Sequence, residues 1–528
     1  MKKTYLLSNG RNWFFRFSDS SFQSKFSGLN SASKHFIDYF AFRIGDKWLD
    51  LNNQKKFDSL NSKAVHEYSL DSAKIKEEIY FSPHLCVDLD IEGKEEIKEI
   101  FLEIGVNIRE WNENFHFRDY NVSFDKKGVI IKNSEKGKVF LKCNKEISVE
   151  KYFYKNHFPG NLTRAYNFDE QEQRCLVVLI KILINSKKEE ILFDFSDLEI
   201  NERENVVKQD LVRKYYFDNL GFTAGFPYFV NLWTRDFCLC SPYLMEMGFT
   251  NEVRETLAIL AKHQKNGNVP SFVGTDVIYD SIDSNPYFII SACLYSLKTN
   301  SKEFYTAIEN AVKTYSSSDI FVCTDDVEKK TWMDSVDRTG CPIEVQALWA
   351  EAFYLYSKLS YTASYFEKGK KIENAIFKQF KNGDYYLDTF SPNRKMRTIN
   401  PLFLPFILDI SKKKAVEIIE KIEEEFLTPQ GVLCYSPKNP DFDANSYHKG
   451  AVWLFLTNIL ILCELKYNRN AKAREIYDLQ KKNMFFRCIN GSDEIYVKSG
   501  FGGSISQLWS DVLFLYAEAK LKEKYLIE

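Results

Sequence analysis

The sequence predicts a chain of two structural classes, an N-terminal β-sandwich followed by an all-α toroid of paired helices. Two observations lead to this prediction. In the first part, short runs rich in β-branched and aromatic residues alternate with polar turn clusters. After about Asp210 the apolar residues recur at helical spacing, without the alternation of strands and helices that a parallel sheet requires. The predicted domains are residues 1–205 and 206–528.

Three segments carry the strand pattern most clearly. Residues 128–145, GVIIKNSEKGKVFLKCNK, predict two strands around a turn at Ser134–Gly137. RCLVVLIKILI (Arg174–Ile184) and EILFDFSDLEI (Glu190–Ile200) are dense in β-branched and aromatic residues. We therefore expect one strand from each of these two runs.

The second part is built from long helical patterns. In NEVRETLAILAKHQKNGNVP, Val253, Leu257 and Leu260 fall on one face, and we expect Gly267 to end the helix. Helices this apolar must be packed on several sides, and we expect roughly ten to twelve of them. Four further segments have the same character: IEVQALWAEAFYLYSKL, KKAVEIIEKIEEEFL, AVWLFLTNILILCEL and ISQLWSDVLFLYAEAKL.

Composition narrows the class of protein. The chain is 45% hydrophobic and 27% charged, which predicts a globular protein able to bury large cores. Its net charge of −2 argues against a nucleic-acid groove or an anionic-membrane patch. Because no run of 18 apolar residues occurs, we expect no membrane span. The apolar run in MKKTYLLSNGRNW is too short for a signal peptide.

The cysteines and histidines predict neither a disulfide framework nor a metal site. Eleven cysteines are scattered without a CxxC pair, several of them inside apolar runs. Reduced, buried thiols in a cytoplasmic protein are the best fit. The seven histidines are not paired at metal-ligand spacing, so we expect no metal and no cofactor.

Five loops between the predicted helices combine aromatic and charged residues. This combination suits a sugar, whose apolar face stacks on aromatic rings while its hydroxyl groups bind Asp, Glu and Arg. Glycoside cleavage needs two further carboxylates, one to donate a proton and one to activate water or attack directly. The five loops are AGFPYFVNLWTRDF (Ala224–Phe237), YDSIDSNPYF (Tyr279–Phe288), TWMD (Thr331–Asp334), SYHKGAVW (Ser446–Trp453) and GSDEIYVKSGFGGSISQLWS (Gly491–Ser510).

Taken singly, each loop has an ordinary explanation. Asp334 could cap the following helix, and an Arg-Asp pair such as Arg235–Asp236 is usually a surface ion pair. The YHKG segment could be a turn, Glu494 a solvated loop acid, and each Trp a core residue. The recurrence of five such loops at helix starts in one domain favours the sugar site.

In order, these loops resemble the C-terminal domain of glycogen debranching enzymes, the amylo-α-1,6-glucosidase module. TWMD followed by IEVQALW is the most specific pair. The first part of the chain is similar in type and length to the β-rich domain that precedes this module in short bacterial and archaeal forms. The segments that carry the resemblance are AGFPYFVNLWTRD, NGNVPSF, YDSIDS, TWMD, PIEVQALW, LTPQGVLCYSP, SYHKGAVW and SISQLWS.

The resemblance implies an (α/α)6 barrel with its active site at one mouth, and an inverting, exo-acting glucosidase. Asp334 matches the general acid of the family, and Arg235 with Asp236 matches the residues that hold the terminal glucose. The other residues that we expect to bind the glucan or oligosaccharide are Trp233, Asp283, Trp332, Glu344, His448, Lys449, Trp453, Gln507 and Trp509.

The general base is assigned to Glu494. Some eukaryotic members of the family carry a catalytic Glu two residues before the Gln of the last motif, but that position is Ile505 in this chain. Glu494 resembles the Glu-x-aromatic loop that carries the base in related glucoamylases. Leu232 and Thr234 replace residues that are commonly Asp and Gly in the family, so we expect the pocket contacts to differ.

The expected activity is release of glucose from α-1,6-glucosyl branch stubs of glycogen or limit dextrin. Because the second catalytic domain for 4-α-glucanotransfer is missing, we expect hydrolysis of a stub and no transfer of a maltosyl chain. The alternatives are a glucoamylase-like α-1,4-glucosidase or a trehalase on the same barrel, a non-catalytic glycan-binding protein, and a structural scaffold. The sequence does not predict the oligomeric state.

Overall fold

The computed structural model describes residues 3–22, 24, 26–60, 62–110, 119–155, 175–198, 211–315, 320–324, 331–390 and 395–527. The chain forms two compact units. One comprises Met1–Lys214 with Arg487–Gly491, and the other Tyr215–Phe486 with Ser492–Glu528. The boundary that the sequence predicts at residues 205 and 206 lies outside the described residues.

The N-terminal unit is an antiparallel sheet of 14 strands. Its main path runs β1-β2-β3-β4-β9-β14-β12-β11-β10, and the remaining strands pair beside β4, β9 and β14. The strands are β1 (Thr4–Ser8), β2 (Asn12–Phe17), β3 (Gly28–Ser31), β4 (Lys34–Ile44), β5 (Lys47–Trp48), β6 (Gln54–Leu60), β7 (Lys63–Ser69), β8 (Ala73–Phe81), β9 (Leu85–Glu110), β10 (Tyr120–Phe124), β11 (Gly128–Asn133), β12 (Gly137–Cys143), β13 (Ile147–Lys155) and β14 (Cys175–Ser196).

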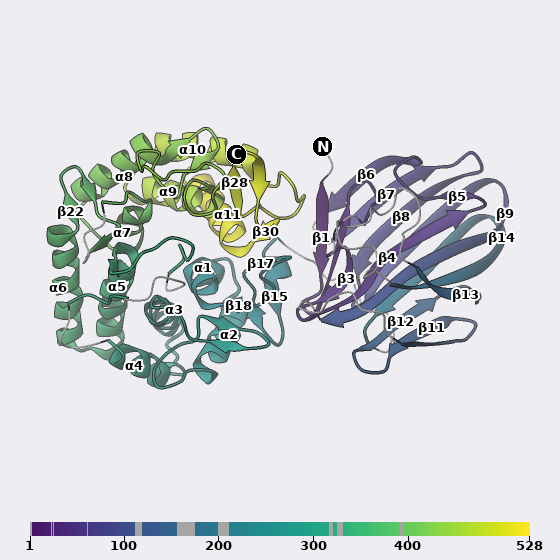
Figure 1. Cartoon of the computed structure of the whole chain (residues 1–528), viewed down its shortest axis with the longest axis horizontal. Helices are drawn as coiled ribbons and strands as arrows, with labels where there is room; N and C mark the ends of the chain where they lie inside the picture. The colour runs from purple at the N-terminus through teal and green to yellow at the C-terminus, as the bar shows by residue number, and fades with distance from the viewer. Residues whose placement is uncertain are drawn as a thin grey trace. The chain divides into compact units, whose positions relative to one another are not determined.

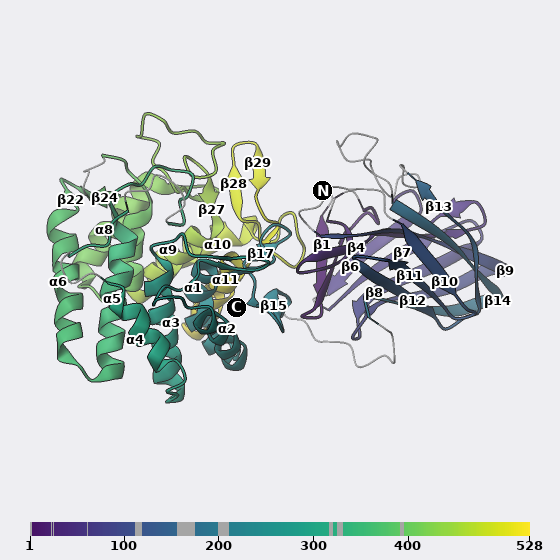
Figure 2. The same ribbon diagram turned by 60° about the horizontal axis from the view of Figure 1, so that its bottom comes forward.

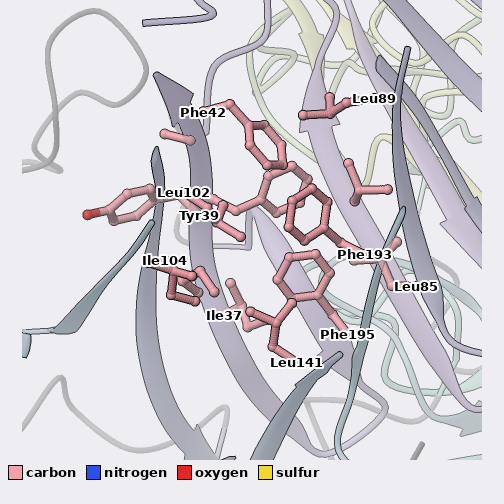
Figure 3. Packing of buried hydrophobic residues seen from close by; sticks show 14 of the residues in the cluster. Ile37, Tyr39, Phe42, Leu85, Leu89, Leu102, Ile104, Leu141, Phe193 and Phe195 are labelled. Carbon is pink, nitrogen blue, oxygen red and sulfur yellow. The ribbon is translucent and has the colours of Figure 1, made fainter. Parts of the chain in front are cut away.

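The two long strands β9 and β14 pair with each other along most of their length. β8 pairs with the first half of β9, and β4 pairs with its second half. The sheet therefore has two arms, one on each half of β9, and β9 and β14 run through both. Rings of β4 pack on rings near the end of β14, with centroids 5.4 Å apart for Phe40 and Phe195 and 5.2 Å for Phe42 and Phe193. The two arms therefore enclose one apolar core, part of which Figure 3 shows.

The strand predictions are partly confirmed. The turn at Ser134–Gly137 is confirmed, because β11 ends at Asn133 and β12 begins at Gly137. The prediction of two strands between Arg174 and Ile200 is wrong, because β14 continues through the polar segment between the two apolar runs. Ladder hydrogen bonds to β9 on either side of that segment hold the strand together despite its polar residues.

The second unit is helical, and the described residues contain eleven α-helices. Six of them, α1, α3, α5, α7, α9 and α11, contact one another in a closed ring. Figure 1 shows the other five outside this ring. The helices are α1 (Thr234–Glu246), α2 (Thr250–Lys262), α3 (Ser284–Thr299), α4 (Tyr305–Lys313), α5 (Ile343–Ser360), α6 (Ala363–Gln379), α7 (Phe403–Ile407), α8 (Lys412–Phe426), α9 (Leu454–Lys466), α10 (Asn470–Asn483) and α11 (Leu508–Glu523).

Burial distinguishes the two sets of helices. In α9, a ring helix, every residue from Leu454 to Leu465 is buried, as expected for a helix packed on all sides. In the outer helix α8 only an apolar stripe is buried, including Ile418, Ile422 and Phe426. The apolar sequence of a helix thus indicates its place in the unit.

Gly267 does not end helix α2 as the sequence predicts. The helix ends at Lys262, before the turn that contains Gly267. Gly267 has a φ of +82°, and a Cβ at this position would lie 2.5 Å from the carbonyl oxygen of Asn310. The glycine is required because the chain passes close to α4 in a left-handed conformation.

Short strands and two 3-10 helices connect the helices of this unit. No helix of the described residues is long and apolar enough to cross a membrane. The connecting elements are η2 (Arg213–Tyr215), β15 (Tyr216–Phe217), β16 (Gly221–Phe222), β17 (Gly225–Phe226), β18 (Leu232–Trp233), β19 (Phe272–Val273), β20 (Val277–Ile278), β21 (Cys341–Pro342), β22 (Lys381–Asn382), β23 (Tyr385–Tyr386), β24 (Thr389–Phe390), η3 (Asn400–Leu402), β25 (Leu427–Thr428), β26 (Gly431–Val432), β27 (Val452–Trp453), β28 (Ile495–Val497), β29 (Gly500–Gly502) and β30 (Ser506–Gln507).

The prediction that all cysteines are reduced is wrong for one pair. Nine cysteines are free and buried, as expected. Cys323 and Cys341 form a disulfide between residues 18 positions apart, and this bond closes the loop that holds Asp334. The sequence could not reveal the pair, because the loop brings together two cysteines that are separated by polar residues. The cytoplasmic location was predicted partly from reduced cysteines, and this argument does not hold for Cys323 and Cys341.

Candidate active site

The five loops singled out in the sequence all lead into ring helices. They precede α1, α3, α5, α9 and α11. Figure 2 shows β24, β27 and β28, which lie in or beside these loops, at one end of the helices. Residues that are far apart in the sequence therefore meet at this end, and their contacts define the candidate site.

Asp334 lies in a turn well before α5 and does not cap this helix, whose N-terminal flanking residue is Pro342. Its side chain is 53% exposed, and its Oδ1 lies 3.6 Å from Nδ1 of His448. The preceding Trp332 is buried and donates from Nε1 to Oδ1 of Asn400 at 2.8 Å. The loop is thus anchored through Trp332 while the carboxyl of Asp334 stays accessible.

His448 is a neutral hydrogen-bond acceptor beside Asp334. The backbone N–H of Ser335 points at Nδ1 from 3.4 Å, and the Ser335 hydroxyl lies 2.8 Å from the same atom. Nδ1 therefore accepts, and the ring proton sits on Nε2. Burial, with Arg338 and Arg235 nearby, lowers the pKa of His448 to about 3. An uncharged imidazole therefore stands beside the carboxyl of Asp334, with Ser335 as its hydrogen-bond partner.

Glu494 is held on both carboxylate oxygens. It is 2% exposed and lies just before β28, whose pairing with β27 sets Ile495 opposite Trp453. The hydroxyl of Tyr447 donates to Oε1, and the backbone N–H of Ser504 donates to Oε2 at 2.8 Å. Donors on both oxygens stabilise the ionised carboxylate, the form that a general base needs.

Tyr447 and His448, which are adjacent in the sequence, contact one carboxylate each. Tyr447 binds Glu494, and His448 lies beside Asp334. Burial, followed by the charges of Glu494, Asp334 and Asp236, raises the pKa of Tyr447 well above its ordinary value, so the phenol keeps its proton. Tyr447 thus contacts Glu494 directly and lies within the electrostatic influence of the other two carboxylates. Sequence reasoning missed Tyr447, although it stands directly before His448 in SYHKGAVW.

Arg235 and Asp236 begin helix α1 with different partners. Arg235 forms a two-pronged ion pair with Asp283, with Nε–Oδ2 at 2.6 Å and Nη2–Oδ1 at 3.1 Å. Asp236 is buried and accepts from Nε2 of Gln507 at 3.4 Å. Burial raises the pKa of Asp236 to about 7, opposed by Arg235 and assisted by Glu494. These four predicted residues are brought together at the site.

Arg338 links the loop of Asp334 to the loop before the ring helix α7, and sequence reasoning missed it. Its guanidinium binds both oxygens of Glu344 at 2.5 and 2.6 Å and both oxygens of Asp388 at 2.8 and 3.0 Å. Asp388 also accepts from Asn400 at 2.7 Å. The carboxylate of Glu344 is therefore engaged in a buried ion cluster, and its predicted contact with substrate stays a prediction.

The predicted tryptophans form a buried aromatic cluster beneath the loops. Trp332, Trp453 and Trp509 are at most 5% exposed. Trp332 contacts His448 and Trp453 edge-on at 5.6 and 5.4 Å, and Trp509 stacks on Phe455 at 4.2 Å. Through these contacts the loop of Asp334, which contains Trp332, packs against the loop of His448, which contains Trp453. Contact of these rings with a sugar stays a prediction.

Trp233 and Lys449 complete the predicted set. Trp233 is half-buried, and its ring contacts Phe272 edge-on at 5.0 Å. Lys449 is also half-buried and pairs with Asp441 of its own loop at 2.8 Å. The ion-pair partner of this lysine is therefore Asp441, and not Asp334, Asp236 or Glu494. Within the described residues, no group of three or more His, Cys, Asp or Glu side chains could hold a metal ion.

The sequence profile of the amylo-α-1,6-glucosidase family matches residues 206–515, a range that contains Asp334, Glu494 and every loop described above. The chain belongs to this family. It is therefore a glycoside hydrolase, and its substrate is a carbohydrate. The five loops were the part of the sequence that indicated this family. The contacts between the loops explain why they occur together.

The structure of this amylo-α-1,6-glucosidase family member resembles that of a solved glycosidase over nearly its whole length. A bacterial glucoamylase complexed with acarbose has a TM-score of 0.65 at 13% identity, covering 98% of this chain and 93% of that chain. The GH63 mannosylglycerate hydrolase from Thermus thermophilus in complex with glucose has a TM-score of 0.47 at 11% identity, covering 58% of this chain and 97% of that chain. No curated protein sequence matches the chain. At 13% identity, the likeness to the glucoamylase concerns the fold alone.

Proposed function

We propose that this hydrolase is an exo-acting glucosidase that releases glucose from α-1,6-glucosyl branch stubs of glycogen or limit dextrin, with inversion. The family match, which spans the whole candidate site, is the observation that carries this proposal. The closed ring of six helices with five helices outside it supports an (α/α)6 barrel as the scaffold.

Asp334 acts as the general acid and Glu494 as the general base. The proton of Asp334 passes to the oxygen that leaves with the glucan, while Glu494 takes a proton from the water that attacks the anomeric carbon. The neutral His448 beside Asp334 and the two donors on Glu494 support this division of roles. Inversion requires a carboxyl separation of about 6.5–9.5 Å, which leaves room for the water.

Arg235 and Asp236 grip the hydroxyl groups of the terminal glucose. Charged groups held by buried partners keep a fixed geometry, and Asp283 holds Arg235 in this way. Trp332 and Trp509 form the floor beneath the sugar, and Trp233, His448 and Gln507 complete the wall. Two carboxylates suffice for this reaction, so the proposal contains no cofactor.

The linkage is tested by comparing three substrates with the purified protein. We expect glucose release from a phosphorylase limit dextrin treated to expose single α-1,6-glucosyl stubs, and much slower release from maltotriose and trehalose. Proton NMR of the first glucose formed then gives the stereochemistry. β-Glucose supports inversion, and α-glucose contradicts it.

A glucoamylase-like α-1,4-glucosidase is the second candidate. The likeness of the fold to a bacterial glucoamylase over 98% of this chain favours it. In that case maltotriose is cleaved faster than the limit dextrin stubs. Both candidates use the same carboxylates, so only the choice of substrate separates them.

A further inference from the structure

A second hollow lies in the helical unit, between the β22–β23 hairpin and helix α8. Its volume is about 410 Å³, within the range of small-ligand sites. Its buried lining includes apolar side chains, Ile418, Ile422 and Phe426 of α8 together with Pro401. We call this hollow the α8 groove. None of the residues predicted to bind the terminal sugar lines it.

Two tyrosines of β23 line the α8 groove, and contacts hold each of them in place. The guanidinium of Arg397 lies 4.0 Å from the ring centroid of Tyr385, a cation–π contact. Asn382 donates a hydrogen bond to the Tyr385 hydroxyl. Tyr386 packs edge-on against Phe377 at 6.0 Å. An ordered aromatic wall beside an apolar floor matches the apolar face of a pyranose ring.

Most charges at the rim of the groove are already paired. Lys421 binds Glu424 at 2.8 Å and lies 3.5 Å from Asp384. Arg397 binds Glu425 on both oxygens, and Arg469 binds Glu420 at 2.7 Å. The paired charges leave little net field to select an ionic ligand, but they keep donors and acceptors at the edge. This chemistry fits an uncharged ligand with many hydroxyl groups better than an organic cation or a phosphate.

Hydrogen bonds connect residues at the α8 groove to the loop of Asp334. Thr398 lines the groove and donates to Asp388, which binds Arg338 of that loop. Asn400, which accepts from Trp332, directly precedes the groove residue Pro401. A glucan bound in the groove would therefore lie beside the catalytic end of the helical unit, where the rest of a branched substrate must pass.

We propose that the α8 groove is a second glucan-binding site, which holds a chain segment of the polymer while another chain end occupies the catalytic site. This inference rests on the proposed function only in taking a glucan as the substrate. The groove would raise affinity for polymers such as glycogen without affecting the cleavage of a small glucoside, because two linked contacts bind more tightly than one.

The test uses two groove variants of the full chain. Tyr385→Ala removes part of the aromatic wall, and Glu417→Arg places a long side chain from the exposed face of α8 across the groove. Tyr361→Ala is the matched control, because this tyrosine is 95% exposed at the C-terminal end of α5 and does not line the groove. Thermal unfolding and circular dichroism verify that each variant is folded.

Binding is measured by affinity electrophoresis in gels containing glycogen, with Asp334→Asn in every chain to prevent turnover. We expect each groove variant to bind glycogen about five- to tenfold more weakly, the loss expected for one aromatic contact. In the active background, the KM for limit dextrin rises by a similar factor, and kcat/KM for α-glucosyl fluoride stays within about twofold. Tyr361→Ala matches the wild type in every measurement.

The outcomes separate this inference from the proposed function. If both groove variants retain wild-type glycogen binding and limit-dextrin KM, the groove is not a glucan site. If the wild type cleaves no glucan but binds glycogen in a way that Tyr385→Ala weakens, the groove stands and the proposed hydrolysis fails. Loss of both small-substrate and polymer turnover in a folded groove variant would also overturn the inference, because the groove would then act through the catalytic loop.

Discussion

The surroundings of Asp334 and Glu494 differ in almost every respect. The side chain of Asp334 is half-exposed and lies beside one neutral imidazole, whereas Glu494 is 2% exposed with a donor on each oxygen. A proton donor must release its proton to a leaving group and then recover another from solvent. A base must stay ionised and aimed at one water. The difference between the two environments agrees with the roles proposed for the two residues.

The largest effect should come from replacing the carboxylates themselves. Asp334→Asn and Glu494→Gln should each lower kcat on limit dextrin by about a thousandfold or more. The two variants should differ on α-glucosyl fluoride, measured by fluoride release, because a fluoride ion leaves without protonation. Asp334→Asn should then recover most of its activity, and Glu494→Gln should not.

The opposite pattern would exchange the two roles. If Glu494→Gln cleaves α-glucosyl fluoride well and Asp334→Asn does not, Glu494 is the acid. Near-normal turnover by Glu494→Gln on both substrates would mean that the base is another residue.

The next effect tests how closely Glu494 must be held. A Cβ at Gly503 would lie 2.2 Å from Oε2 of Glu494, so Gly503→Ala should displace the carboxylate. We expect kcat to fall by about a hundredfold, as for a misplacement near 1 Å. Gly45→Ala is the control, because Gly45 has a similar φ of +60° against +67° and no atom within 4 Å of its added Cβ.

Both glycine variants should lose stability from the left-handed backbone, by about 1–2 kcal/mol. Only Gly503→Ala should lose activity. Equal kcat values for the two variants, measured after denaturant titrations of each, would show that the position of Glu494 tolerates this displacement.

A smaller effect is expected from the hydroxyl of Tyr447. Tyr447→Phe keeps the ring but removes the donor to Oε1 of Glu494, and kcat should fall about tenfold. The acid limb of the kcat/KM profile should move to higher pH, because the ionised carboxylate loses a donor. Tyr477→Phe removes a similar bond, from a tyrosine hydroxyl to Glu518 at 2.6 Å, between α10 and α11. It should change stability without shifting the pH profile.

The last prediction concerns the stability of the fold and Asp236, a third carboxylate at the site. Burial raises its pKa to about 7, above the value near 3.8 expected in the unfolded chain. Between these values the folded protein holds a proton that the unfolded chain has lost, so this group makes the fold less stable as pH rises. Asp236→Asn should gain stability relative to wild type from pH 4 to 7, by no more than about 1.4 kcal/mol per pH unit.

Urea unfolding at four pH values between 4 and 8 measures this slope. Asp276→Asn, at an exposed position in the β19–β20 turn, is the control and should follow the wild type. A stability difference for Asp236→Asn that does not depend on pH would show that Asp236 is ionised across this range.

Much of the helical unit was predictable because helical periodicity is a local property. The helices quoted from the sequence correspond to α2, α5, α8, α9 and α11, and all five chemistry-bearing loops precede ring helices. The sixth loop was missed. Its segment DYYLDTF (Asp384–Phe390) combines acids and aromatic rings as the other loops do, but it precedes α7, a helix of only 5 residues, so no long helical pattern follows it in the sequence.

The sequence by itself determined the succession of a strand-rich and a helix-rich part, the apolar faces of the helices, and the acids and indoles that indicate a sugar site. Only the tertiary structure decided their partners: Arg338 with Glu344 and Asp388, Tyr447 with Glu494, His448 with Asp334, and Cys323 with Cys341. The physical reason is the range of the signal. Periodicity and turn residues act within a few positions, whereas these contacts form where separate loops meet above the helix ring.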